Sequence, residues 1–113
     1  MLKIDAEYKR GILFLRFIGK LNNKTKKELL DILEMINNVG IKYIMFNFEK
    51  LTFIDDDGIR LIRNISKKML DKNGKILTCG SSSLIRLKLE KNKVNNYTLE
   101  INNELGAFKL INI

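Results

Sequence analysis

The sequence predicts an α/β protein built on a small mixed β-sheet of four to five strands. Residues 2–8 alternate apolar and polar side chains, and residues 12–18 are almost wholly apolar. The intervening Lys9-Arg10-Gly11 is typical of a turn, so the two runs predict a β-hairpin. From residue 25 onwards, helical periodicity alternates with short apolar runs, an order that joins parallel strands through right-handed crossovers. An antiparallel hairpin beside parallel strands makes the predicted sheet mixed.

The first helix is expected to begin at Thr25 and to end near Asn38. Thr25-Lys26-Lys27-Glu28 has the Thr-x-x-Glu spacing of a capping box, in which two side chains satisfy amide groups left free at a helix start. Asn37-Asn38-Val39-Gly40 supplies a helix stop. Between these ends, four apolar residues at helical spacing predict one buried stripe: Leu29, Ile32, Leu33 and Ile36.

The stretch Phe46–Ile62 organises the rest of the chain. A strand expected over residues 42–48 leads into it, and the apolar character continues to Ile54 before the chain turns at Asp55-Asp56-Asp57-Gly58. An amphipathic helix is predicted behind this turn because apolar side chains recur at helical spacing: Ile59, Ile62, Ile65 and Met69.

The chain after this helix holds shorter elements. Cys79, the only cysteine, lies in an apolar run and is expected to be a small core residue rather than a nucleophile. In order, the sequence predicts a strand over residues 75–79, a short helix over 84–90 capped by Ser81-Ser82-Ser83, a short strand over 97–101 and a terminal helix from Asn102-Asn103-Glu104.

The three consecutive carboxylates at residues 55–57 are the strongest functional signal. Asp55 or Asp56 can cap the following helix, because a short side-chain oxygen accepts the free amide protons at a helix start. One carboxylate satisfies that need, and the other two repel each other. Two surplus charges on an exposed tip indicate a recognition or regulatory surface. A helix that is merely over-capped stays open as the alternative.

Length and composition bound the function. The 113 residues predict a single domain over 1–113, and 45% hydrophobic with 30% charged residues is typical of a globular protein. No apolar run approaches the roughly 18 residues of a membrane span, and the first residues lack a secretory signal. We therefore expect a cytoplasmic protein without membrane insertion. The sequence contains no histidine, which excludes Ser-His, Cys-His and His-metal sites, and no feature indicates a cofactor.

The formal net charge of +8 raises the question of nucleic-acid binding. Lysines are scattered along the chain, and the densest cluster, Lys24, Lys26 and Lys27 beside Lys20, lacks interleaved aromatic residues. The pattern therefore does not favour a nucleic-acid partner.

Two stretches resemble the signatures of the STAS domain family, which includes bacterial anti-sigma factor antagonists. Residues 19–25, Gly-Lys-Leu-Asn-Asn-Lys-Thr, are similar to the family's Gly-x-Leu-Asp-x-x-Thr. Residues 51–59, Leu-Thr-Phe-Ile-Asp-Asp-Asp-Gly-Ile, are similar to its Leu-x-Phe-Ile-Asp-Ser-Ser-Gly-Leu. The resemblance covers nearly the whole chain in order, and it implies helices packed mainly on one face of the sheet.

The resemblance also implies a non-enzymatic binding switch. In the antagonist branch, an anti-sigma factor that is also a kinase phosphorylates the first serine of the second signature, and Asp56 occupies the corresponding position. Asp57 replaces the neighbouring hydroxyl, and Asn22 replaces an aspartate of the first signature. Phosphoserine carries about −1.5 to −2 charges and a carboxylate carries one, so Asp56 is a partial mimic of the modified state. A constitutive or a permanently phospho-like module is expected.

The partner expected from this resemblance is an anti-sigma factor or kinase-like ATPase. One alternative is an accessory subunit that docks on a transport ATPase. Another is an acidic metal or phosphoacceptor site, although consecutive carboxylates cannot all converge on one ion. The predicted partner-binding or regulatory residues lie in the two signatures: Asn22, Thr25, Asp55, Asp56, Asp57, Gly58 and Ile59.

Overall fold

The computed structural model describes residues 1–111 as an alternation of strands and helices. A 3₁₀ turn at Val94–Asn96 separates the last two regular elements from the preceding helix. No helix within the described residues is long and apolar enough to cross a membrane. The elements in order are β1 (Leu2–Lys9), β2 (Ile12–Leu21), α1 (Lys26–Ile36), β3 (Tyr43–Ile54), α2 (Asp56–Asp71), β4 (Lys75–Cys79), α3 (Ser83–Lys91), β5 (Thr98–Glu100) and α4 (Glu104–Leu110).

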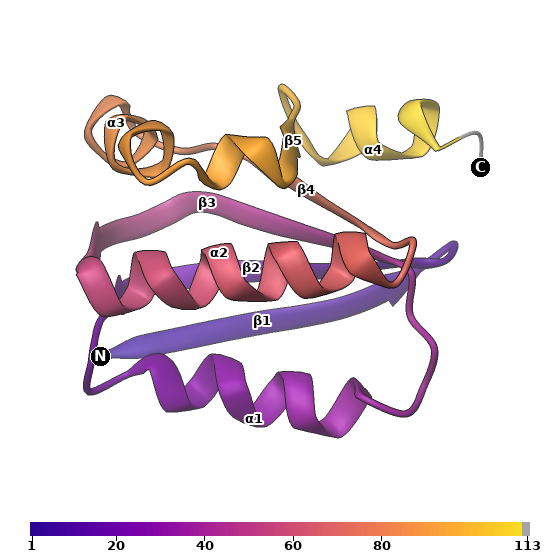
Figure 1. Ribbon diagram of the computed structural model, residues 1–113, viewed down its shortest axis with the longest axis horizontal. Helices are drawn as coiled ribbons and strands as arrows, with labels where there is room; N and C mark the ends of the chain where they lie inside the picture. The colour runs from indigo at the N-terminus through magenta and orange to yellow at the C-terminus, as the bar shows by residue number, and fades with distance from the viewer. Residues whose placement is uncertain (112–113) are drawn as a thin grey trace.

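The five strands form one mixed sheet in the order β1-β2-β3-β4-β5, which confirms the predicted fold class (Figure 1). β1 pairs antiparallel with β2 through the hairpin, and the other three neighbouring pairs are parallel. Each parallel connection contains a helix, as such crossovers require.

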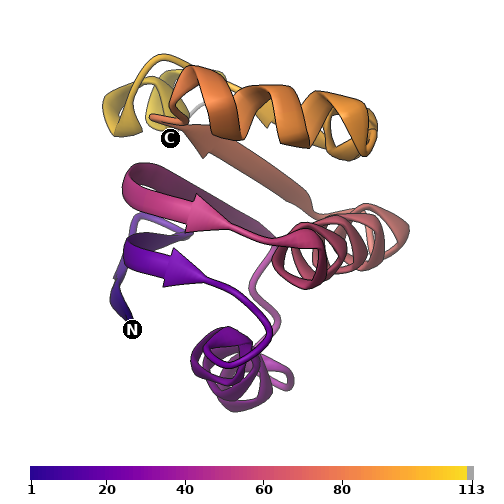
Figure 2. The ribbon, with the colours of Figure 1, turned by 90° about the vertical axis from the view of Figure 1, so that its left-hand side faces the viewer.

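Three of the four helices pack on one face of the sheet. Leu29 of α1, Ile59 of α2 and Ile85 of α3 belong to the larger hydrophobic core, and α4 covers a smaller cluster on the other face through Ala107. Figure 2 shows α1 and α2 beside the strands on the first of these faces. The prediction that helices pack mainly on one face is therefore confirmed.

β2 and β3 are longer than the apolar runs that predicted them. They end at Leu21 and Ile54 rather than at residues 18 and 48, and those two residues are paired in register. Beyond Asn47, β3 has lost β4 as a neighbour and pairs with β2 alone. The part of β3 beyond Asn47 has a neighbouring strand on one side only, so it is less buried and accepts polar side chains. The apolar pattern therefore ends before the strand does.

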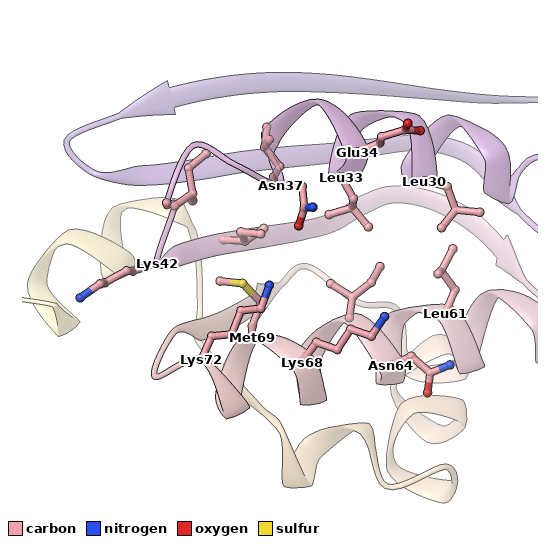
Figure 3. Close-up of a pocket in the computed structure, with 15 residues that line it drawn as sticks. Leu30, Leu33, Glu34, Asn37, Lys42, Leu61, Asn64, Lys68, Met69 and Lys72 are labelled. Atoms are coloured by element: carbon pink, nitrogen blue, oxygen red, sulfur yellow. The ribbon is translucent and has the colours of Figure 1, made fainter.

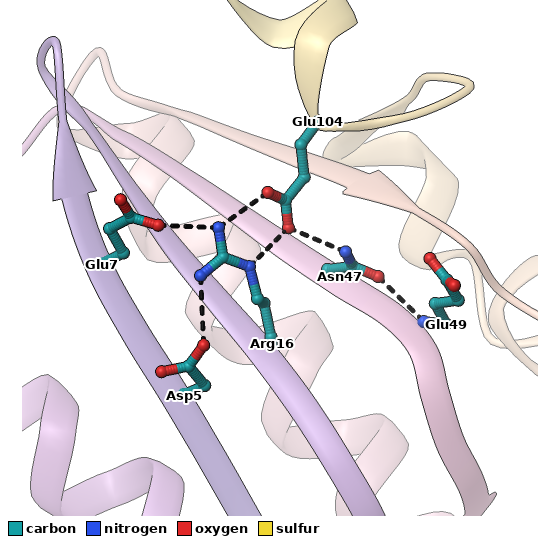
Figure 4. A network of polar contacts seen from close by, with 6 residues as sticks. All are labelled: Asp5, Glu7, Arg16, Asn47, Glu49 and Glu104. Atoms are coloured by element: carbon teal, nitrogen blue, oxygen red, sulfur yellow. Dashed lines mark hydrogen bonds and ion pairs between the residues drawn. The ribbon is translucent and has the colours of Figure 1, made fainter.

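Arg16, the single charged residue of the apolar run in β2, anchors α4 to the sheet (Figure 4). Its Nε and Nη2 each donate to the Glu104 carboxylate at 2.8 Å. Its guanidinium also pairs with Asp5 at 3.1 Å and Glu7 at 2.9 Å on the neighbouring strand β1. The Asn47 amide donates to Glu104 at 2.8 Å, so two strands hold the first residue of α4.

This network makes stability depend on pH. Hydrogen bonds from Arg16, and then from Asn47, hold the pKa of Glu104 below its ordinary 4.5 despite partial burial. A group with a lowered pKa stabilises the fold above its unfolded pKa and loses that contribution as pH falls through the folded value. We expect Glu104→Gln to lower the free energy of unfolding at neutral pH by about 1 kcal/mol and to flatten its decline below pH about 4.5. Urea unfolding across pH measures both.

Glu100→Gln is the matched control for Glu104→Gln. Glu100 pairs with Arg86 at 3.2 Å, but both side chains are largely exposed. Exposed pairs contribute little, so this variant should change stability by less than about 0.5 kcal/mol. Equal effects of the two substitutions would contradict an anchoring role for Glu104.

Candidate functional site: an acidic turn at the start of α2

The site lies where β2 and β3 end together, at the left-hand end of Figure 1. We call Asp55–Gly58 the acidic turn and Asn22–Thr25 the facing loop. The Asp55 amide donates to the Leu21 carbonyl at 3.2 Å, which holds the two segments side by side. The paired strand ends thus bring together two signatures that lie about thirty residues apart in the sequence.

Asp55 is the N-cap of α2 and also binds the facing loop. Its Oδ1 accepts a hydrogen bond from the Gly58 amide at 2.8 Å, as the sequence predicted for Asp55 or Asp56. Its Oδ2 accepts from the Asn23 amide at 2.9 Å. Both oxygens of this carboxylate are therefore used to join the helix start to the loop.

Gly58 and Ile59 are buried beneath the turn. A Cβ atom on Gly58 would lie 2.8 Å from both the Leu21 carbonyl oxygen and a side-chain carbon of Ile54, so only glycine fits there. Ile59 is 1% exposed and packs in the main core. Both were predicted among the partner-binding or regulatory residues; the structure places them inside the fold, where they shape the turn and are not displayed on the surface.

The facing loop is held by its own side chains. Asn22 Oδ1 accepts from the amides of Lys24 and Thr25 at 2.9 and 3.0 Å. The Thr25 hydroxyl donates to the Lys20 carbonyl at 2.7 Å and accepts from the Asn22 amide at 2.9 Å. Thr25 makes no capping hydrogen bond to α1, so the predicted capping box is wrong. The hydroxyl is turned back into the loop, which spacing alone cannot show.

Asp57 is neutralised by its own helix. Arg60, one turn further along, forms an ion pair with it. The Arg60 guanidinium also donates a hydrogen bond to the Asp57 carboxylate, and this bond lowers the pKa of Asp57. The charges of Arg60 and Lys26 act in the same direction. The spacing of three residues would have allowed this pair to be predicted from the sequence.

Asp56 differs from its two neighbours. Its side chain is exposed, and it forms no ion pair or side-chain hydrogen bond with another of the described residues. As the first residue of α2, it lies in the favourable field of the helix N-terminus. Of the three carboxylates, Asp56 is the one that the fold leaves available.

The sequence model of the STAS domain matches residues 3–107, which is nearly all of the chain. The chain belongs to the STAS domain family. A curated relative, the anti-sigma F factor antagonist of Paenibacillus polymyxa, is 24% identical over 107 residues, covering 94% of this chain and 92% of the relative.

Two solved structures share the fold of this STAS domain. The anti-sigma factor antagonist SpoIIAA in its unphosphorylated form has a TM-score of 0.76 at 18% identity, covering 99% of this chain and 98% of that one. A serine-to-glutamate variant of RsbS from Moorella thermoacetica has a TM-score of 0.81 at 15% identity, covering 97% and 96%. At these identities the likeness establishes the five-stranded α/β fold.

Two residues beside the acidic turn of this STAS domain were not predicted from the sequence. Lys88 of α3 donates to the Ile54 carbonyl at 2.8 Å, immediately before the turn. Its ammonium group also lies 5.0 Å from the ring centroid of Phe53, which is 43% exposed. A cation and an apolar ring therefore border the acidic turn. No local pattern links residue 88 to residue 54, so only the fold reveals the contact.

The geometry does not support the acidic metal or phosphoacceptor alternative. Within residues 1–111 there is no group of three carboxylate or thiol side chains placed to hold a metal ion. Asp55 is directed at backbone amides and Asp57 at Arg60, so the carboxylates of the turn do not converge.

Cys79 lies in β4, away from the acidic turn, and is only 3% exposed. Burial raises the pKa of its thiol to about 11, and the nearby Glu104 and Glu49 carboxylates act in the same direction. A thiol of this kind is protonated at neutral pH and unreactive. The residue is part of the core, as predicted.

Proposed function

We propose that this STAS domain is a non-catalytic protein-interaction module of the anti-sigma factor antagonist kind, with the permanent charge of Asp56 as part of its recognition surface. The observation that carries the proposal is that Asp56 is exposed and unpaired among residues 1–111, beside two carboxylates that are both engaged. Family membership and the antagonist relative from Paenibacillus polymyxa support a protein partner.

The contacts of the turn support Asp56 as the carboxylate that such a partner meets. Three adjacent carboxylates suggested a tip that approaches the charge of phosphoserine. Both oxygens of Asp55 accept from backbone amides and Asp57 is paired with Arg60, so Asp56 is the carboxylate of the turn whose oxygens remain free to accept from a partner. We infer that a partner meets the Asp56 carboxylate there, with Lys88 and Phe53 at the end of β3 that leads into the turn.

A kinase of the anti-sigma factor class has no hydroxyl to modify at position 56. Phosphorylation of residue 56 therefore cannot switch the interaction on or off. The fraction of the partner that is bound is set by the concentrations of the two proteins.

The partner is expected to distinguish charge at position 56. With an anti-sigma factor of the kinase-like ATPase class as the probe, we expect Asp56→Asn to weaken binding about tenfold, because it removes the charge while keeping the shape. Titration calorimetry measures the dissociation constant. Asp56→Ser should bind as weakly as Asp56→Asn. When it is incubated with the kinase-class partner and ATP, intact mass spectrometry should show that it gains one phosphate, whereas the wild type gains none.

Asp31→Asn supplies the matched control for Asp56→Asn. Asp31 is an exposed aspartate on α1, so its replacement changes the net charge by the same amount at a distance from the turn. It should leave binding unchanged. Tight binding of the wild type that survives both Asp56→Asn and Asp56→Ser would show that Asp56 is not a recognition element.

A further inference from the structure

A second feature of the surface lies between α1 and α2, behind the acidic turn. The two helices pack on the same face of the sheet but leave a cavity of about 640 Å³ between them. Small-molecule sites commonly have volumes of about 300–1,000 Å³. The cavity is lined by the later part of α2, so it is separate from the turn at the start of that helix.

The floor and walls of this cavity are apolar. Leu30 and Leu33 come from α1, and Leu61, Ile65 and Met69 come from α2 (Figure 3). Leu30 is 43% exposed although it lies beside a large core. Contiguous apolar surface of this kind is costly in water unless something covers it.

The polar groups of the cavity are predominantly cationic. Lys68 of α2 and Lys72, the residue that follows α2, project toward the space between the helices, and Lys42 lies at one end, directed outward (Figure 3). Glu34 is the single acidic lining residue. None of the three lysines forms an ion pair with a residue in the range 1–111. An apolar cleft with free ammonium groups along one wall is complementary to an anionic amphiphile.

We propose that the cleft between α1 and α2 binds a free single-chain carboxylate with a long alkyl tail, of the fatty-acid class. The tail lies along Leu33, Leu61 and Met69, and the carboxylate meets the Lys68 and Lys72 ammonium groups. The amide side chains of Asn37 and Asn64, which also line the cleft, can donate to the same head group.

A structural role for the lysines makes a different prediction. Lys68 lies in the last turn of α2, where a cation stabilises the helix through its dipole. If stabilising the helix were the whole role of Lys68, its replacement would lower the free energy of unfolding but would leave the dissociation constant of the ligand unchanged. Replacing both lysines separates the two roles, because ligand affinity and stability are measured independently.

Titration calorimetry with saturated carboxylates of increasing chain length, each below its micellar concentration, tests the proposal. Each added methylene should tighten the dissociation constant about fourfold until the cleft is filled. Lys68→Met with Lys72→Met should weaken dodecanoate binding about tenfold and leave the binding of dodecanol unchanged. Leu61→Phe should lower the chain length at which affinity stops rising, because it fills part of the cleft.

Arg63→Met with Lys67→Met is the matched control for the double lysine variant. Both residues are exposed on α2, outside the cleft, and the charge change is the same. The proposal is overturned if dodecanoate does not bind, if affinity is independent of chain length, or if the control weakens binding equally. Binding to phosphatidylglycerol vesicles without binding to monomeric dodecanoate, or a dimer by sedimentation that closes the cleft, would equally overturn it. None of these measurements depends on the partner proposed to contact Asp56, so the cleft is tested independently of the acidic turn.

Discussion

Replacing Gly58 with alanine should lower the free energy of unfolding by about 2–3 kcal/mol. The added Cβ would lie 2.8 Å from the Leu21 carbonyl oxygen, a backbone atom that cannot rotate away, and 3.1 Å from Leu21 Cγ. The start of α2 must then move away from the end of β2, although alanine is a better helix former than glycine. Urea unfolding measures the change.

Gly106→Ala is the matched control for Gly58→Ala. Gly106 also lies in a helix, α4, but a Cβ there would have its nearest neighbour, Ile101 Cδ1, at an ordinary 3.6 Å. Without a clash, the helix propensity of alanine should raise stability by up to about 1 kcal/mol. The two substitutions should therefore have opposite signs. A stabilising Gly58→Ala would show that α2 does not depend on close contact with β2.

Replacing Asp55 with alanine should cost about 2 kcal/mol of unfolding free energy. The substitution removes the cap of α2 and the hydrogen bond to the Asn23 amide in one step. Because the same carboxylate joins the helix to the facing loop, the loop should also lose order. Hydrogen exchange of the Asn23 and Gly58 amides, together with urea unfolding, measures both effects.

Two further variants, one at residue 55 and one at residue 56, separate the capping hydrogen bond from the effect of negative charge at the start of α2. Asp55→Asn keeps one oxygen for the cap of α2, and asparagine is about as good an N-cap as aspartate, but its NH₂ group cannot accept from the Asn23 amide, so the capping part of the stability should remain while the loop contact is lost. Asp56→Ala removes a neighbouring charge without removing a hydrogen bond, and should cost less than about 1 kcal/mol. If Asp56→Ala were as damaging as Asp55→Ala, the assignment of the cap to Asp55 would be wrong.

The order of the elements could be predicted because it depends on local periodicity. The stripe that includes Leu29 and the one that includes Ile59 each recur at helical spacing, and both belong to the main core. The ends of β2 and β3 could not be predicted, because they depend on which neighbours remain alongside the part of β3 beyond Asn47. The Thr25 capping box failed for a similar reason, since the hydroxyl prefers the Lys20 carbonyl.

The site could be located from the sequence, but the roles within it could not be divided. Residue type was enough to predict a capping carboxylate at Asp55 or Asp56. That Asp55 binds an amide 32 residues earlier, and that Lys88 of α3 reaches the turn, depends on tertiary structure. The availability of Asp56 follows only once the partners of the other two carboxylates are known.

The inert thiol of Cys79 gives this chain a practical advantage for spectroscopy. Because the only cysteine is 3% exposed and its pKa is about 11, maleimide dyes should not react with its thiol under native conditions. A second cysteine introduced at an exposed position would then be the sole labelling point, with no need for a cysteine-free background. Two such variants, one labelled near the acidic turn and one labelled near the cleft, would then report separately whether each site is occupied.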